Sequence, residues 1–171
     1  MTHGHDHDPA CEAAHGHAPA DRQARTLVAV FASPVAECLL RYGAELGFHT
    51  VLLEPDPARA LPGHPAEREP GPYLDAGTDV VLTDHHREEI GPLLRDLLAT
   101  PARWIGIMGS PRHTGPHVRA LRDLGVDDAQ IARVHRPIGL NIGSQSPPEI
   151  AVATLAGLIA DRNGRPGGFT F

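Results

Sequence analysis

The stretch that decides the fold is TLVAVFASPVAECLLRYGAELGFHTVLLE, residues 26–54. Its first part, TLVAVFAS (26–33), is a nearly continuous apolar run of strand length, as expected for a parallel strand covered on both faces. Ser33 and Pro34 then predict a helix start, with serine at the N-cap and proline at the first helical position. Because HTVLLE (49–54) predicts a second strand, this segment is typical of a parallel α/β sheet.

The same alternation continues to the end of the chain. TDVVLTD (78–84) and RWIGIMG (103–109) predict further strands, and residues 86–99 have the apolar spacing of a helix. Ser110 and Pro111 again predict an N-cap and a first helical residue, and Ser146 with Glu149 predicts a capping box for the last helix. We therefore expect a three-layer α/β Rossmann-like domain with a mainly parallel sheet over residues 26–163.

The two ends of the chain have a different composition. Residues 1–25 contain almost no bulky apolar side chains and are expected to be a disordered tail, and residues 164–171 form a short C-terminal tail. The N-terminal tail is rich in histidine, which binds nickel, zinc and copper. Its candidate ligands for a divalent metal are His3, His5, His7, His15 and His17. A metal-handling protein that uses this tail is one functional hypothesis, and an unselected polar extension is the alternative.

Composition excludes several classes of protein. The chain has 171 residues, with 15 basic and 21 acidic side chains, so it lacks the positive surplus that binds nucleic acid. All the basic side chains are arginine, which excludes a Walker-type phosphate lysine and a Schiff-base lysine. No apolar run is long enough to cross a membrane or to form a signal segment, and with only Cys11 and Cys38 we expect the reducing cytoplasm.

Three Ser-Pro pairs are predicted to begin helices at one edge of the sheet. They start at Ser33, Ser110 and Ser146. Since helices that follow parallel strands begin at the carboxyl edge, where free N–H groups favour anions, this edge is predicted to bind a phosphate. His85, after the strand at 78–84, and Arg112 are expected at the same edge. The alternative for each serine is a helix cap without a ligand.

A dinucleotide-binding enzyme is a second hypothesis for this edge of the sheet. Glu54 ends the second strand, where an acidic residue holds the ribose of NAD. The glycine-rich G-x-G-x-x-G turn is absent, because residues 31–36 are FASPVA. An NAD(P)-dependent oxidoreductase or another nucleotide-binding Rossmann domain therefore stays open as a second hypothesis.

The order of three segments is distinctive. TDVVLTDHH (78–86), WIGIMGSPRHT (104–114) and VHRPIGLNIGSQSPPEIAVATLAGLIA (134–160) together resemble the C-terminal Rossmann-like domain of the XdhC/CoxI family. This family comprises accessory proteins of xanthine and carbon monoxide dehydrogenases. The resemblance implies a protein that binds molybdenum cofactor, a pterin with a phosphate and a dithiolene, and helps to insert it into the enzyme. It implies a non-catalytic carrier rather than an enzyme.

The resemblance and the predicted edge together give the candidate cofactor-binding residues. They are Ser33, Glu54, His85, Gly109, Ser110, Arg112, Pro137, Gly139, Asn141, Gly143, Ser144 and Ser146. The expected partner is a molybdenum hydroxylase of the xanthine or carbon monoxide dehydrogenase type. Because family members usually carry a further N-terminal domain, a separate family member is expected to supply it. The sequence leaves open whether the chain forms a homodimer.

Overall fold

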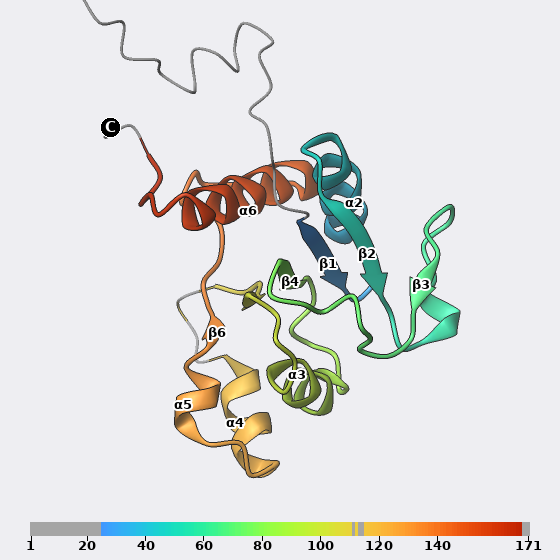
Figure 1. The fold of residues 1–171 in the computed structure, drawn as a ribbon, viewed down its shortest axis with the longest axis vertical. Coiled ribbons are helices and arrows are strands. Elements are labelled where there is room, and N and C mark those ends of the chain that lie inside the picture. Colours follow the sequence, from blue (N-terminus) through green and yellow to red (C-terminus); the bar gives the residue numbers. More distant parts are fainter. Residues whose placement is uncertain (1–24, 111, 113–114, 169–171) are drawn as a thin grey trace, which may run out of the picture.

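The computed structural model describes residues 25–110, 112 and 115–168, and its strands form one sheet (Figure 1). The sheet has six strands in the order β3-β2-β1-β4-β5-β6, and every adjacent pair is parallel. The strands are β1 (Thr26–Val30), β2 (His49–Leu53), β3 (Ala66–Glu67), β4 (Thr78–Leu82), β5 (Trp104–Ile107) and β6 (Val134–His135). The predicted Rossmann-like sheet is confirmed, and β3 and β6 are its short edges.

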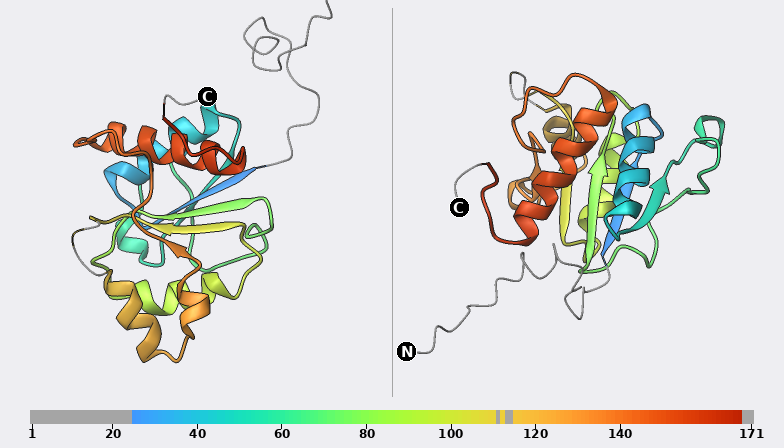
Figure 2. Two further views of the ribbon diagram at one scale, coloured as in Figure 1. Left: turned by 90° about the vertical axis from the view of Figure 1, so that its left-hand side faces the viewer. Right: turned by 90° about the horizontal axis from the view of Figure 1, so that it is seen from above.

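The helices cover both faces of the sheet and complete the three predicted layers (Figure 2). Described helices are α2 (Pro34–Glu45), α3 (Ile90–Leu98), α4 (Pro116–Asp123), α5 (Asp128–Ile131) and α6 (Pro147–Arg162), with a 3-10 turn at Pro57–Arg59. α2 packs against α6 on one face, and α3 packs against α4 on the other. None of these helices is long and apolar enough to cross a membrane.

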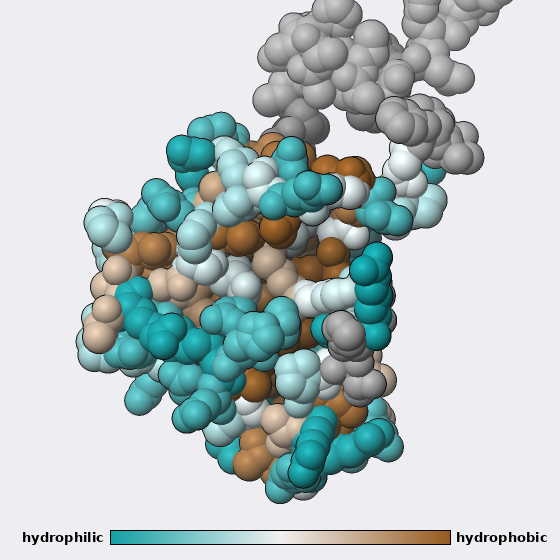
Figure 3. Space-filling view, turned by 180° about the vertical axis from the view of Figure 1, so that it is seen from behind, coloured by the Kyte–Doolittle hydropathy of each residue, from teal (hydrophilic) through white to brown (hydrophobic). Residues whose placement is uncertain are grey.

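Alternate side chains of the central strands face opposite layers, as the period of a strand requires. Leu27 and Val81 belong to the apolar cluster that includes α2 and α6 residues, whereas Val28 and Val80 belong to the cluster with α3. All four side chains are fully buried. Apolar surface remains visible among the hydrophilic side chains in the upper part of the molecule, where α2 and α6 lie (Figure 3).

Two of the three predicted Ser-Pro helix starts are confirmed. The Ser33 hydroxyl accepts a hydrogen bond from the Ala36 N–H at 3.0 Å and donates one to Thr83 Oγ1 at 2.8 Å. The first contact caps α2, and the second ties this cap to the end of β4. At α6, Ser146 and Glu149 form the predicted capping box. Both helix starts are therefore fixed at the carboxyl edge of the sheet.

Replacing Ser33 by Ala should lower the free energy of unfolding by about 1–2 kcal/mol, because it removes a helix cap and the bond to Thr83. Urea unfolding followed by circular dichroism measures this change. The matched control is Ser144→Ala, whose hydroxyl makes no hydrogen bond to a described residue and whose replacement should cost less than about 0.5 kcal/mol. Equal effects of the two substitutions would refute the stabilising role of the cap.

The third prediction, that Ser110 caps the helix after β5, is wrong. α4 begins at Pro116 with Gly115 at its N-cap position, so Ser110 lies five residues before that cap. The Ser110 hydroxyl instead accepts a hydrogen bond from the Arg112 N–H at 3.2 Å, which closes a turn. The physical reason is that a second possible helix start, Gly115-Pro116, follows in the chain. It also places a proline at the first position of the helix, where proline is favoured.

The helix predicted from residue 86 also begins later, at Ile90. The His86 N–H donates to Asp84 Oδ1 at 2.8 Å, a local side-chain turn that competes with a helical start. The Arg87 side chain is buried in an ion pair with Glu54. The segment after β4 is therefore a loop at the carboxyl edge of the sheet.

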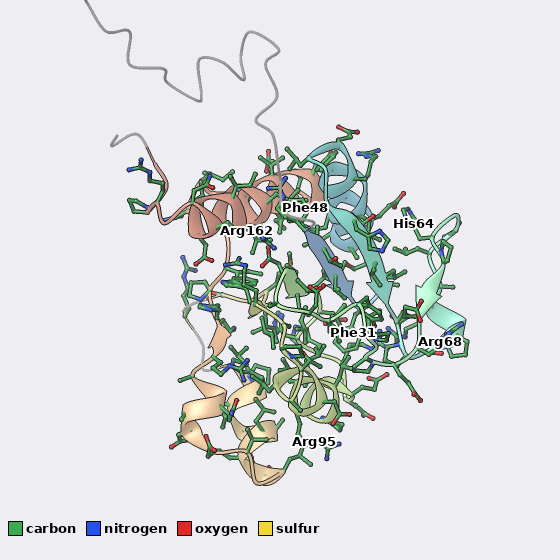
Figure 4. The ribbon with its side chains drawn as sticks, in the orientation of Figure 1. Phe31, Phe48, His64, Arg68, Arg95 and Arg162 are labelled. Atoms are coloured by element: carbon green, nitrogen blue, oxygen red, sulfur yellow. The ribbon has the colours of Figure 1, made fainter. Side chains whose placement is uncertain are left out.

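The opposite, amino edge of the sheet anchors the C-terminal end of α6. Asp79 is fully buried and pairs with Arg103 and Arg162, each at 2.7 Å. The Arg162 guanidinium lies 5.7 Å from the centre of the Phe48 ring, and Figure 4 shows these two side chains together below α6. α6 is thus held at both ends, by its cap at one and by Asp79 at the other.

Candidate functional site

A cavity of about 600 Å³ opens at the carboxyl edge of the sheet. Three loops and two helices form it: the loops after β4, β5 and β6, the first turn of α2 and the first two turns of α6. Its lining residues are Val35, Thr83, His85, Met108, Gly109, Ser110, the run from Pro137 to Ser144, Ile150, Ala153 and Thr154. This is the edge at which open α/β sheets bind their ligands.

Most of the sequence-predicted site residues meet in this cavity. Those that line it are His85, Gly109, Ser110, Pro137, Gly139, Asn141, Gly143 and Ser144. They come from three loops that are up to 59 positions apart in the chain, counted from His85 to Ser144. Ser33, Glu54, Arg112 and Ser146 are not among the lining residues.

The segment from Pro137 to Ser144 rests directly on α6. The Leu140 N–H donates to the Ala153 carbonyl at 3.0 Å. Gly139 has a φ of +84°, and a Cβ there would lie 3.1 Å from the backbone of Ala153 and Thr154. A Cβ on Gly157 would in turn lie 3.1 Å from the Gly139 Cα. Two glycines therefore permit this close approach, and the packing fixes one wall of the cavity.

Several backbone donors border the cavity without a partner in the described chain. The N–H groups of Asn141, Gly143 and Ser144 donate no hydrogen bond to any described residue, and the same holds for Gly109 and Ser110. Gly143 has a φ of +70° and open space around it. Such glycine-rich turns leave backbone amides accessible to the oxygen atoms of a ligand.

The starts of α2 and α6 offer fewer donors than the sequence suggested. Pro147 and Pro148 have no N–H, and the Glu149 carboxylate accepts from the N–H groups of Gln145 and Ser146 at 2.8 and 3.2 Å. Ser33 uses its hydroxyl for the α2 cap. Ser33 and Ser146 therefore act as helix caps, and the open donors lie in the loops after β5 and β6.

Glu54 is engaged elsewhere. Its side chain is fully buried and receives two hydrogen bonds from Arg87, at 2.9 and 3.1 Å. It also accepts from the Ala32 N–H at 2.8 Å and from the Asp56 N–H at 2.9 Å. Burial by itself would raise the pKa of Glu54, but Arg87 and the two amides outweigh burial and hold that pKa below its usual value. The carboxylate is charged and has no free oxygen for a ribose.

The turn after β1 is closed by the same pair. Phe31 is fully buried with a φ of +70°, a region that non-glycine residues rarely adopt. The Arg87 guanidinium lies 4.5 Å from the centre of its ring, and Figure 4 places Phe31 in the middle of the molecule. The place where a dinucleotide fold presents glycines to a pyrophosphate is filled by these side chains.

His85 is the titratable side chain of the cavity lining. Its ring centre lies 4.0 Å from that of His86. Burial lowers the pKa of His85 below 6.5, and the neighbouring His86 and Arg136 lower it further. Arg112 is exposed. Within the described part of the chain no three metal-ligating side chains come together. The five tail histidines lie outside the described residues, so the metal-binding tail stays a prediction.

We expect His86→Ala to raise the pKa of His85, because it removes a neighbouring group that disfavours the imidazolium. Since the folded-state pKa lies below the unfolded value, the folded protein should lose stability as pH falls below about 6.5. A pH titration of the His85 ring by NMR measures the first effect. Thermal unfolding between pH 7 and 5 measures the second, and a His85 pKa unchanged by the substitution would contradict this interpretation.

Several lining residues were not predicted from the sequence. They are Val35, Thr83, Met108, Ile150, Ala153 and Thr154. Ile150, Ala153 and Thr154 follow an i, i+3, i+4 spacing, which places them on one helix face. The sequence predicts the start of this helix from Ser146 and Glu149. The helical spacing of the residues that follow was therefore the signal that could have identified the face of α6 toward the cavity.

The fold and the cavity at the carboxyl edge of the sheet define a Rossmann-like domain whose site is built from the loops after β4, β5 and β6. Residues 27–158 match the family model of the XdhC Rossmann domain. This match covers more than half of the chain and contains every lining residue of the cavity. The chain belongs to the XdhC Rossmann-domain family.

Two individual proteins are similar to this chain. The uncharacterized protein YqeB of Escherichia coli is 41% identical over 75 residues, which are 44% of this chain and 14% of YqeB. The crystal structure of a xanthine dehydrogenase from Bacillus halodurans matches with a TM-score of 0.66 and 24% identity. That match covers 82% of this chain and 45% of the Bacillus chain. The protein therefore spans less than half of either relative, and the structural match supports the fold.

Proposed function

We propose that this protein is an accessory protein of a xanthine dehydrogenase-type molybdoenzyme. It holds molybdenum cofactor in the cavity at the carboxyl edge and releases it to the enzyme. The observation that carries the proposal is that Gly109–Ser110 and Pro137–Ser144, which belong to the segments that resemble the XdhC family in sequence and lie within the family match, line the cavity.

The cavity has the size and lining that a phosphorylated pterin needs. Its volume of about 600 Å³ lies within the range of about 300–1,000 Å³ that is typical of small-molecule sites. Ile138, Leu140 and Ile142 offer apolar surface to a ring, and the amides of Gly109 and Gly143 offer donors to oxygen atoms. When bound, the cofactor supplies the molybdenum and dithiolene on which the recipient enzyme's redox chemistry depends.

A carrier fits the lining better than an enzyme does. His85 is the one titratable side chain among the described lining residues, and its ring makes no hydrogen bond to a described carboxylate or hydroxyl group. The loops offer backbone N–H groups that can hold the oxygen atoms of a ligand. We propose retention and delivery, with the chemistry left to the recipient.

The partner is a molybdenum hydroxylase. The support is the family match together with the structural similarity to a protein described as a xanthine dehydrogenase.

The alternative of a nicotinamide-dependent oxidoreductase has less support. Glu54 and Arg87 fill the site where the ribose and pyrophosphate of a dinucleotide would bind, and both carboxylate oxygens of Glu54 are already hydrogen-bonded. Titration with NADH, followed by its fluorescence, should give no saturable signal.

A cofactor transfer assay tests the proposed function. Molybdenum cofactor released from a denatured molybdoenzyme is mixed with an apo-dehydrogenase, with and without the full chain at equal concentration. We expect the chain to increase the recovered dehydrogenase activity several-fold and to slow the oxidation of the free pterin. Serum albumin is the protein control. Recovery equal to that with albumin, together with saturable NADH binding, would replace this proposal by the oxidoreductase alternative.

A further inference from the structure

Asn141 is a lining residue of the cavity and lies at the centre of a tight turn. The Ile142 N–H donates to the Leu140 carbonyl at 2.9 Å, which closes a three-residue turn around Asn141. Leu140 is itself tied to α6, because its N–H donates to the Ala153 carbonyl at 3.0 Å. Backbone hydrogen bonds therefore fix the position of Asn141 relative to α6, and they do not depend on its side chain.

The side-chain amide of Asn141 makes no hydrogen bond to any described residue. An amide carries an acceptor oxygen beside a donor nitrogen in one plane. Such a group binds two neighbouring ligand atoms at once, one that donates and one that accepts, as amide side chains do on the edges of nucleic-acid bases. Asn141 therefore offers the cavity a donor and an acceptor at a fixed spacing.

The other polar side chains of the described lining do not offer such a pair. The Thr83 hydroxyl donates to the Phe31 carbonyl at 2.9 Å. The Thr154 hydroxyl donates to the Ile150 carbonyl at 2.9 Å. The lining serines carry one hydroxyl hydrogen each, and a neutral imidazole has its donor and its acceptor on different sides of the ring. Among the described lining side chains, Asn141 alone matches a ligand edge that presents a donor next to an acceptor.

We propose that Asn141 is a specificity residue that recognises the lactam edge of a heterocycle held in the cavity. The ring N–H donates to Asn141 Oδ1, and Asn141 Nδ2 donates to the neighbouring ring carbonyl. Leu140 and Ile142 also line the cavity and supply apolar surface to the ring. The inference rests on the proposed function for the identity of the ring, because a pterin carries this lactam in its pyrimidine half.

The test compares the binding of two probes, pterin and 3-methylpterin, to the full chain. In 3-methylpterin a methyl group replaces the hydrogen of the lactam N–H, and the ring system is otherwise the same. Titration calorimetry measures the affinity for each probe. We expect 3-methylpterin to bind at least about tenfold more weakly than pterin, since a site that pairs with an N–H rejects the analogue that lacks it.

Substitutions at position 141 separate recognition from packing. Asn141→Leu keeps a similar volume but removes the donor and the acceptor, so pterin affinity should fall about tenfold and the two probes should bind equally. The smaller Asn141→Ala should lose the discrimination too, which shows that a clash of leucine is not the cause. Gln145→Leu is the matched control and should keep the discrimination, because Gln145 is an exposed amide of the same loop that does not line the cavity.

The outcomes distinguish this inference from the proposed function. Equal affinity of the unmodified protein for pterin and 3-methylpterin would overturn the role of Asn141 and keep the pterin site. Discrimination that is unchanged in Asn141→Leu would do the same. A folded, unmodified protein that binds neither probe would overturn both the role of Asn141 and the proposed ligand.

Discussion

Replacing Glu54 by Gln should lower the free energy of unfolding by about 3–5 kcal/mol, since it leaves the buried Arg87 guanidinium without its charged partner. The Glu54 carboxylate is fully buried and accepts four hydrogen bonds, two from Arg87 and one each from the N–H groups of Ala32 and Asp56. An amide keeps one acceptor oxygen and turns a donor toward the guanidinium. Urea unfolding at pH 7 measures the loss.

The matched control acts on the same arginine from the solvent side. Glu89 pairs with Arg87 at 2.9 Å and its side chain is 43% exposed. Glu89→Gln should cost less than about 1 kcal/mol, because exposed ion pairs contribute little. If both substitutions cost the same, the burial of Glu54 has no special role in holding the turn after β1.

Replacing Ser110 by Phe should reduce the amount of ligand retained by the purified protein at least about tenfold, which corresponds to about 1.4 kcal/mol or more of binding free energy. Ser110 borders the cavity beside Gly109, and a phenyl ring there takes the volume that a pterin or its phosphate would need. Ser110 lies outside every helix and strand and is exposed, so the fold should tolerate the ring. Retained pterin, measured by fluorescence after oxidation, reports the effect.

Two further variants keep this prediction testable. Ser144→Phe enlarges a second lining residue from the opposite loop and should also reduce retention. Ala44→Phe adds a ring at an exposed position of α2 that does not line the cavity, and it should retain as much ligand as the unmodified protein. Equal retention by all three variants would place the ligand outside this cavity.

The sheet could be predicted from the sequence because each central strand is recognisable from its own apolar residues. TLVAV at Thr26–Val30 and TDVVL at Thr78–Leu82 are apolar in the way that buried parallel strands require, and both are strands in the structure. The caps at Ser33 and Ser146 were also predictable, since capping depends on neighbouring residues alone. Ser110 failed as a helix cap because two Pro-containing starts compete within six residues, and local rules do not rank them.

The part of the site that lies in continuous sequence motifs could also be predicted. Glycines and serines of the loops after β5 and β6 were identified as candidates, because their motif is continuous in the chain. The roles of Glu54 and Arg87 depend on a contact across 33 positions, which no local pattern reveals.

The central claim is that the cavity between Gly109–Ser110 and Pro137–Ser144 holds molybdenum cofactor. The most direct measurement is the pterin and molybdenum content of the full chain after expression in a host that makes this cofactor, purified without an added affinity tag. We predict close to one pterin per chain, lost in Ser110→Phe and kept in Ala44→Phe. A folded protein without pterin, from a host whose cofactor supply is verified by an active molybdoenzyme, would contradict the claim.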